Sequence, residues 1–426
     1  MTKSEDISIV WFRRDLRLED NPALSEASKQ GSILPIFIFN DEIQCDFIGQ
    51  ASAIWLHHSL KNLNDSLNGK LNIYIGNPTQ IINDLILKHE VKNVFWNISY
   101  EPTLIKEAQK VWQICEKRNV KCNSFNGNYL WHPKDILKDD KSYYKVFTAY
   151  RNKVLSLQNE FALCENDQLK IIKDSVLNID NLELLVDHSW VKSLLNFCES
   201  GESNALRKFD LFIENRLKFY QKGRDYPSHA KTSMLSAHLH FGEISPRRIY
   251  NNIMNIGQVY APESDVKHFV NEVVWREFSN YLLYHFKGLP NQNFNNKFDN
   301  FEWEFNKKHF ESWKRGLTGY PIIDAGMRQL WQTGYMHNRV RMVVASFLVK
   351  NLNIDWRHGR DWFWECLFDA DLANNSASWQ WIAGCGADAA LYFRIFNPTL
   401  QAEKFDPDGE YIRHFVPELK DIPNKD

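Results

Sequence analysis

Short apolar runs alternate with helical patterns over the first 130 residues of the chain. Five runs rich in β-branched and aromatic residues predict strands. These strands are Ile7–Phe12, Ile33–Phe39, Leu71–Ile75, Val91–Trp96 and Val120–Phe125. Helical patterns fill the intervals: the first helix follows a cap at Asp20 with Pro22 in its first turn, and the others cover about residues 52–68, 78–89 and 103–119. This alternation is typical of an α/β fold with a doubly wound parallel sheet.

The pattern changes after residue 130. Residues 131–200 are polar, with isolated helical stretches and no clear strand. From residue 201 onward the periodicity is helical: Ser245 and Pro246 form a typical helix start, and Asp265–Phe286 carries apolar residues at a spacing of three to four. We therefore expect an α/β domain in residues 1–130, a linker in 131–200 and an all-α domain in 201–426.

Composition narrows the class of protein. Apolar residues make up 44% and charged residues 24% of the chain, as in a globular protein. No run of about 18 apolar residues predicts a membrane helix, and the polar N-terminus does not resemble a signal peptide. The seven cysteines are scattered and never spaced C-x-x-C, which favours neither a zinc site nor a disulfide framework. The expectation is a cytoplasmic, monomeric protein without a metal or a membrane partner.

Tryptophan is unusually frequent in the helical half. Nine of the fifteen tryptophans lie between Trp275 and Trp381. Aliphatic residues fill a core without an indole N–H to satisfy, so the excess suggests stacking or electron transfer. The net charge of −2 argues against a protein that coats nucleic acid, but residues 331–360 hold five Lys or Arg against one acid. A local basic surface is therefore compatible with the sequence.

Two polar motifs in the helical half suggest binding of a phosphorylated heterocycle. Lys231–Ser236 places three hydroxyls ahead of an apolar stretch, and hydroxyls with free N–H groups at a helix start can bind a pyrophosphate. Ordinary N-capping is the alternative. Asp369 and Asp371 lie in an apolar, aromatic neighbourhood where carboxylates need partners, and Arg341 is an available cation. They could bind a flavin edge or form a structural ion pair.

A third motif lies within the predicted helix Asp265–Phe286. Glu272, Trp275, Arg276 and Ser279 are one helical turn apart in overlapping pairs. A carboxylate beside an indole could bind a nucleobase edge while the ring stacks on the base. A partly buried amphipathic helix explains the same spacing.

Several longer motifs resemble the photolyase/cryptochrome family. They are Trp11–Asn21, Thr318–Arg328, Met336–Met342 and Tyr392–Pro398. The similarity runs from about residue 7 to residue 420, and within the family the chain looks most like bacterial class I cyclobutane pyrimidine dimer photolyases. The resemblance implies blue-light-driven DNA repair by an enzyme that binds FAD in its helical domain.

The resemblance also implies a role for particular residues around FAD. The phosphates and the ribityl region would be held by Tyr220, Thr232, Ser233, Met234, Leu235 and Ser236. The rest of the cofactor would be surrounded by Phe269, Glu272, Arg276, Asn338, Arg341, Asp369, Asp371 and Asn375. Asn375 would face flavin N5, and Arg341 would pair with Asp369.

The implied partner is UV-damaged DNA, with the dimer flipped into a pocket over the flavin adenine. Glu272 would hydrogen-bond a pyrimidine edge, in a pocket lined by Trp275, Asn338, Met342 and Trp381. Contacts to phosphates at the rim are expected from Arg224, Arg339, Arg394, Gln401 and Lys404. Glu272, Asn375 and Met342 are the residues expected closest to the reaction.

The implied chemistry is electron transfer from excited, fully reduced FAD to the dimer, followed by opening of the cyclobutane ring and return of the electron. Trp379, Trp356 and Trp303 match the family's tryptophan chain, which re-reduces oxidised flavin in light.

Departures from the family pattern leave some properties open. Met234 stands where bacterial relatives often have Arg, and Tyr100–Leu104 lacks the Asn-Glu pair that binds a folate antenna. The antenna is therefore folate, deazaflavin, flavin or absent.

Three alternative functions remain. A cryptochrome photoreceptor shares the fold and the flavin, although such proteins often carry a long C-terminal extension that this chain lacks. A six-four photolyase would ordinarily have His in place of Met342. A light-independent flavin oxidoreductase would need a substrate site beside flavin N5, whereas the matched pocket faces the adenine.

Overall fold

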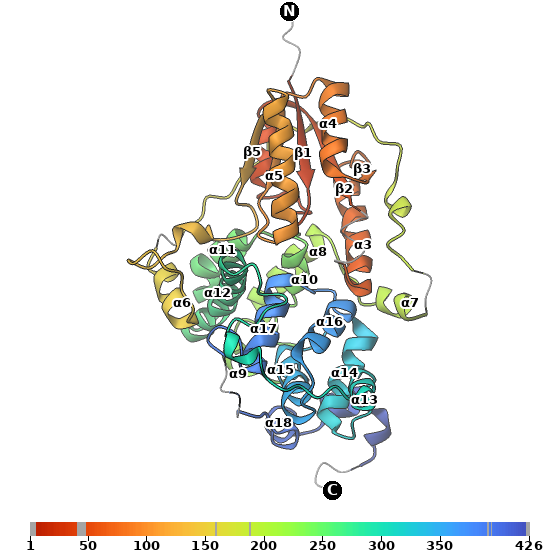
Figure 1. Cartoon of the computed structure of the whole chain (residues 1–426), viewed down its shortest axis with the longest axis vertical. Helices are drawn as coiled ribbons and strands as arrows, with labels where there is room; N and C mark the ends of the chain where they lie inside the picture. Colours follow the sequence, from red (N-terminus) through yellow and green to blue (C-terminus); the bar gives the residue numbers. More distant parts are fainter. Residues whose placement is uncertain are drawn as a thin grey trace, which may run out of the picture.

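The computed structural model describes residues 6–40, 48–157, 160–186, 189–389, 392 and 394–422. An α/β half from the N-terminal part of the chain lies above a helical half in Figure 1. The five predicted strands form one parallel sheet in the order β3-β2-β1-β4-β5. Their bounds are β1 Asp6–Phe12, β2 Gly31–Phe39, β3 Asn72–Ile75, β4 Asn93–Asn97 and β5 Lys121–Phe125. The chain starts in the middle of the sheet and winds outward both ways, which confirms the doubly wound prediction.

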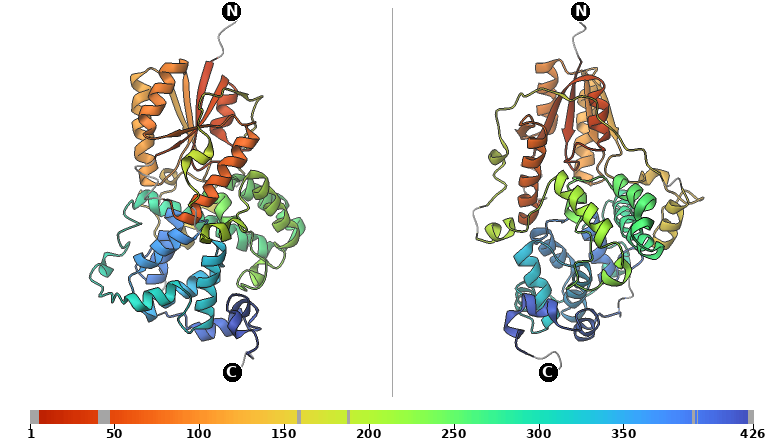
Figure 2. Two further views of the ribbon diagram at one scale, coloured as in Figure 1. Left: turned by 90° about the vertical axis from the view of Figure 1, so that its right-hand side faces the viewer. Right: turned by 180° about the vertical axis from the view of Figure 1, so that it is seen from behind.

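Helices cover both faces of this sheet, as Figure 2 shows. They are α1 Pro22–Ser28, α3 Gln50–Ser66, α4 Pro78–His89 and α5 Pro102–Lys117. Ile9 and Trp11 of β1 pack in the core shared with α4 and α5, whereas Val10 and Phe12 pack in the core shared with α1 and α3. Burial on both faces explains why the strands are continuous apolar runs in the sequence.

The predicted cap at Asp20 is wrong by one residue. Asn21 caps α1, because its side chain accepts a hydrogen bond from the Leu24 N–H at 3.2 Å. Asp20 has a left-handed backbone with φ of 49°. Its carboxylate accepts hydrogen bonds from Ser245 and from Arg247 (2.8 Å), so Asp20 joins the two halves instead of starting a helix.

The connector between the halves is more ordered than its polar sequence suggested. It contains a short strand, β6, at Lys170–Ile171, which pairs in parallel with β2, so the expectation of no strand there is corrected. Its helices are α6 Phe147–Leu155 and α7 Ser189–Leu195, with 3₁₀ turns at Pro133–Asp135 and Ile179–Leu182.

The described residues beyond the connector form helices and no strands. The helices of this half are α8 Glu202–Asn215, α9 Tyr220–Gly223, α10 Ser236–His240, α11 Pro246–Tyr260, α12 Glu263–His285, α13 Lys307–Lys314, α14 Pro321–Thr333, α15 Asn338–Ser346, α16 Trp356–Cys366, α17 Leu372–Ala383, α18 Pro398–Phe405 and α19 Glu410–Phe415; a π turn covers Phe347–Asn351 and 3₁₀ turns cover Asn296–Phe298 and Pro417–Leu419. Ser245 caps α11 as predicted, accepting from the Arg247 N–H at 3.1 Å. No helix in the described ranges has the length and apolarity needed to cross a membrane.

A buried polar cluster joins α3 to the helical half. Glu243 accepts hydrogen bonds from the Trp55 indole N–H at 3.2 Å and from Ser59, and it contacts the His238 ring. Ser52 donates to the Leu367 carbonyl at 2.9 Å. Because Glu243 and His238 are fully buried, this cluster fixes the helical half directly below α3.

Candidate functional site

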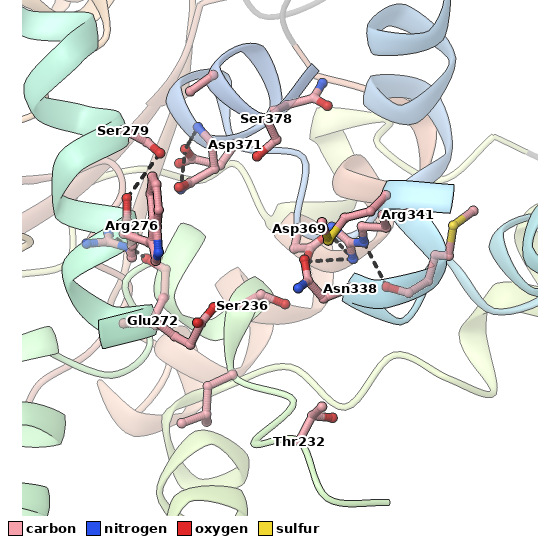
Figure 3. A pocket seen from close by; sticks show the side chains of 18 of the residues that line it. Thr232, Ser236, Glu272, Arg276, Ser279, Asn338, Arg341, Asp369, Asp371 and Ser378 are labelled. Carbon is pink, nitrogen blue, oxygen red and sulfur yellow. Dashed lines mark hydrogen bonds and ion pairs between the residues drawn. The ribbon is translucent and has the colours of Figure 1, made fainter. Parts of the chain in front are cut away.

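A cavity of about 710 Å³ lies in the helical half, between the segment before α10 and helices α12, α15 and α17. Its volume falls in the range of roughly 300–1,000 Å³ that small-molecule sites occupy. The cavity wall includes every residue that the resemblance assigned to FAD. They are Tyr220, Thr232, Ser233, Met234, Leu235, Ser236, Phe269, Glu272, Arg276, Asn338, Arg341, Asp369, Asp371 and Asn375. Figure 3 draws 18 of the lining residues and labels ten, which come from segments far apart in the sequence.

The hydroxyl-rich segment faces the cavity and does not cap a helix. Thr232, Ser233 and Ser236 line the wall, while the residue before α10 is Leu235 and makes no side-chain capping bond. The capping alternative is therefore wrong. Met234 has a left-handed φ of 57°, a conformation that costs energy for a residue with a side chain and that marks this turn as constrained.

Arg341 and Asp369 form an ion pair within the cavity wall. Arg341 Nη2 lies 3.0 Å from both carboxylate oxygens, and Arg341 Nε donates to the Met336 carbonyl at 2.7 Å (Figure 3). The ion-pair interpretation and the binding-site interpretation are thus compatible. The Met336 carbonyl and Asp369 together hold the guanidinium at the cavity surface.

Asp371 is tied down from several directions. Its carboxylate caps α17 by accepting from the Asn374 N–H at 2.9 Å, and it lies 3.2 Å from His240 Nδ1. Burial alone would raise the pKa of Asp371, but the His240 hydrogen bond and the positive charge of Arg276 outweigh burial and hold the pKa well below its usual value. Asp371 is therefore an anionic acceptor at neutral pH.

Glu272 and Arg224 form an ion pair at another part of the wall. The Arg224 guanidinium also lies over the Tyr220 ring, 5.5 Å from its centroid. Burial would lower the pKa of Arg224, but the charge of Glu272 and its hydrogen bond, with smaller contributions from Tyr220 and Asp225, together outweigh burial and raise the pKa above its ordinary value. Since the Glu272 side chain is 34% exposed, its carboxylate remains accessible from the cavity mouth.

Arg276 lines the cavity, yet its charged end points elsewhere. The guanidinium donates to the Asn128 carbonyl at 3.1 Å, to the Leu239 carbonyl at 3.4 Å and to Glu277 at 3.1 Å. These bonds use three of the five N–H groups of the guanidinium and hold it against acceptors of the protein itself. The sequence therefore identified Arg276 as a residue of the cavity wall but did not show which groups its guanidinium contacts.

Glu277 is a buried carboxyl group that the sequence did not reveal. It accepts from the Leu130 N–H at 2.9 Å, and burial raises its pKa to about 7 despite the opposing charge of Arg276. A charged residue next to Arg on a long helix suggests a solvated pair, so no sequence signal marked this position. Asp225, Tyr335 and Asn374 also line the cavity and were not predicted.

The residues predicted to bind the lesion divide into two groups. Trp275, Asn338, Met342 and Trp381 line the cavity, together with Arg224 and Arg339. Arg339 pairs with Asp225 at 2.8 Å and lies 4.4 Å from the Phe405 ring centroid, which brings the end of α18 next to this arginine.

Arg394, Gln401 and Lys404 do not line the cavity. Gln401 and Lys404 lie on α18, and Arg394 is an exposed residue whose carbonyl accepts from Lys350 Nζ at 2.9 Å. They can contribute only to a surface around the site.

Trp379 and Trp356, two of the three tryptophans predicted for electron transfer, are buried, and the third, Trp303, is partly exposed. Trp379 lines the cavity, and its ring centroid is 5.0 Å from that of Phe363 on α16. Trp356 starts α16, is fully buried and donates to Asn293 Oδ1 at 3.1 Å. Trp303 is half-buried. The backbone N–H of its neighbour Glu304 donates to the Asn353 carbonyl at 2.9 Å, close to the start of α16.

Asn375 is also fixed by α16. Its side-chain N–H donates to the Arg360 carbonyl at 3.1 Å, which orients the amide at the cavity wall. A single orientation of this amide is what recognition of a polar ring edge requires.

Known families match both halves of the chain. Residues 8–166 match the family described as DNA photolyase, and residues 269–426 match the FAD binding domain of DNA photolyase. The deoxyribodipyrimidine photo-lyase of Agrobacterium fabrum is 43% identical, over 98% of this chain and 88% of its own length. Cryptochrome-1 of Arabidopsis thaliana is 32% identical, over 98% of this chain and 63% of its own length. The crystal structure of a bacterial class III photolyase from Agrobacterium tumefaciens has a TM-score of 0.95 and 41% identity, with 99% of this chain and 89% of that chain covered.

Proposed function

This chain belongs to the photolyase/cryptochrome family, and from that premise we propose that it repairs cyclobutane pyrimidine dimers in UV-damaged DNA with light absorbed by FAD. One observation carries the proposal: the cavity that holds the cofactor residues also has a wall formed by Glu272, Trp275, Met342 and Trp381. A cofactor site alone would suit a photoreceptor equally well. The similarity to a class III photolyase leaves the class I assignment a prediction.

The residues present fit FAD. Thr232, Ser233 and Ser236 offer hydroxyls for a pyrophosphate, while the Arg341–Asp369 pair and the fixed Asn375 amide offer donors and acceptors for a polar ring. Reduced FAD bound here would supply the light-absorbing group and the electron that opens the dimer. The protein's own contribution is to hold the cofactor and the lesion next to each other in one cavity.

The lesion would be bound by stacking and by one carboxylate. Trp275 and Trp381 offer indole faces to a flipped pyrimidine, and Glu272 can accept a hydrogen bond from a pyrimidine N–H. Arg224 and Arg339 lie at the same cavity and would bind phosphates beside the lesion. Each phosphate neutralised in duplex DNA adds roughly 0.9 to the slope of log affinity against log salt.

Trp379, Trp356 and Trp303 would carry an electron inward to oxidised flavin. This role is supported by the position of Trp379 in the cavity wall and by the decrease in burial from Trp356 to Trp303. The identity of the antenna stays as predicted from the sequence: folate, deazaflavin, flavin or none.

The test is a light-driven repair assay. Reduced protein is mixed with an oligonucleotide that carries one thymine dimer and illuminated with blue light, and recovery of thymine absorbance is followed. Repair that requires both light and flavin supports the proposal. Normal photoreduction of the flavin without binding or repair of the dimer would instead support a photoreceptor, which is the alternative that the similarity to Cryptochrome-1 favours.

A further inference from the structure

The connector helix α6 places an aromatic ring against Trp275. The rings of Phe147 and Trp275 are stacked, with centroids 3.5 Å apart and planes inclined by 7°. Trp275 lines the cavity, whereas Phe147 does not. Phe147 therefore covers a part of the indole that is not turned to the cavity.

Phe147 is itself firmly held. It is the first residue of α6, is only 6% exposed, and its N–H donates to Asp388 Oδ2 at 3.3 Å. Its ring also meets Phe278 of α12 edge-on, with centroids 5.8 Å apart. The bond to Asp388 attaches the start of α6 to the segment that follows α17, next to Ala387 in the cavity wall.

The next turn of α6 strengthens this attachment. The fully buried ring of Tyr150 lies 5.1 Å from Phe278 and 4.8 Å from Tyr281, both on α12. Figure 1 shows α6 beside α12, at the side of the helical half. The position of Phe147 is thus fixed by contacts that do not involve Trp275.

We propose that Phe147 is a positioning residue, which holds the Trp275 indole so that its free face is ready to stack on a flipped pyrimidine. The proposal rests on the repair function proposed above. Ordering a side chain during binding lowers affinity, and a ring already fixed from behind avoids much of that cost. The connector would then contribute to lesion recognition although none of its described residues lines the cavity.

Three variants separate positioning from general packing. Phe147→Leu removes the stacked ring but keeps an apolar side chain, Phe147→Tyr keeps the ring, and Tyr150→Leu is the matched control on the same helix. Dissociation constants are measured for a thymine-dimer oligonucleotide and for its undamaged counterpart, with FAD content and Tm measured in parallel. Because a Trp275 side chain freed by Phe147→Leu would have to be ordered again on binding, this substitution should weaken lesion binding about twofold to tenfold. Affinity for undamaged DNA should not change, and Phe147→Tyr should retain lesion affinity.

The Trp275→Ala background gives the decisive measurement. If Phe147 acts through the indole, Phe147→Leu has no further effect on lesion affinity once Trp275 is absent. An equal loss in both backgrounds overturns the proposal, as does a loss of lesion discrimination in Tyr150→Leu that matches Phe147→Leu. These results would leave the repair function standing when the wild type repairs the dimer. A wild type that neither discriminates nor repairs the dimer overturns the function itself, and the role of Phe147 with it.

Discussion

Replacing Glu272 by Gln removes one negative charge from the cavity mouth and nearly preserves the shape of the side chain. The amide oxygen of Gln can still accept a hydrogen bond from the pyrimidine, but the bond would lose its charge, and charged hydrogen bonds contribute about 1–1.5 kcal/mol more than neutral ones. Affinity for a thymine-dimer oligonucleotide should therefore fall roughly 5- to 10-fold. The ion pair with Arg224 would be lost at the same time.

The released Arg224 makes the prediction two-sided. Without the Glu272 charge, this arginine is available to a phosphate, so affinity for undamaged DNA should stay constant or increase. The log–log salt slope for undamaged DNA should rise by up to roughly 0.9. Discrimination between damaged and undamaged DNA should thus fall for two reasons: damaged DNA binds more weakly, and undamaged DNA binds equally well or more tightly.

The assay is a titration of both oligonucleotides at several salt concentrations, with flavin absorbance recorded for each preparation. Glu263→Gln is the matched control: it makes the same change of charge on the same helix, at an exposed residue paired with Lys267 at 2.6 Å. Equal effects of the two substitutions would refute the reasoning, because they would show that net charge alone is responsible. Loss of flavin in Glu272→Gln would show that this residue mainly supports the cofactor.

Three further predictions concern electron transfer, packing and pH. Trp303→Phe should slow photoreduction of oxidised flavin but spare repair by pre-reduced enzyme. Transient absorption measures photoreduction and the repair assay measures repair; equal losses in both would argue against electron transfer through the three tryptophans. Gly359→Ala should cost about 1–3 kcal/mol in thermal unfolding and slow photoreduction, because its Cβ would lie 2.1 Å from the Trp379 ring; an unchanged Tm would contradict this packing. Glu277, whose pKa is raised to about 7, stabilises the fold below its unfolded pKa, and that stability is lost as pH rises toward 7. The unfolding free energy of the wild type minus that of Glu277→Gln should therefore grow by about 2 kcal/mol in total on acidification from pH 7 to 5, and a pH-independent difference would contradict the assignment.

The parallel sheet was accessible from sequence because strands buried on both faces are continuous apolar runs. The two-residue strand β6 was not, since Lys170 and Ile171 join the sheet through backbone pairing with β2 and carry no apolar run. Asp20 and Asn21 are both good capping residues, but tertiary contacts with Ser245 and Arg247 hold the Asp20 carboxylate away from the helix start.

In the cavity, too, some features could be predicted from the sequence and others could not. The polar motifs and, above all, the family resemblance identified residues that share the wall. They could not show where a long side chain directs its charge: Arg276 reaches the Asn128 carbonyl, which lies 148 residues away in the sequence. Glu277 and Phe147 were missed for a related reason, since each is buried by contacts between segments far apart in the sequence.

Two arginines of the cavity wall, Arg224 and Arg339, suggest how a protein with a net charge of −2 can select damaged over undamaged DNA. Arg224 and Arg339 are each paired with a carboxylate in the free protein, Glu272 and Asp225 respectively. A phosphate must therefore replace or share an existing partner, which reduces the gain from binding undamaged DNA. In the proposed function, a flipped lesion would add stacking on Trp275 and a hydrogen bond to Glu272 that intact DNA would not supply. Weak attraction at the rim combined with specific contacts in the cavity makes discrimination depend on the pocket, so substitutions there should change lesion affinity far more than affinity for undamaged DNA.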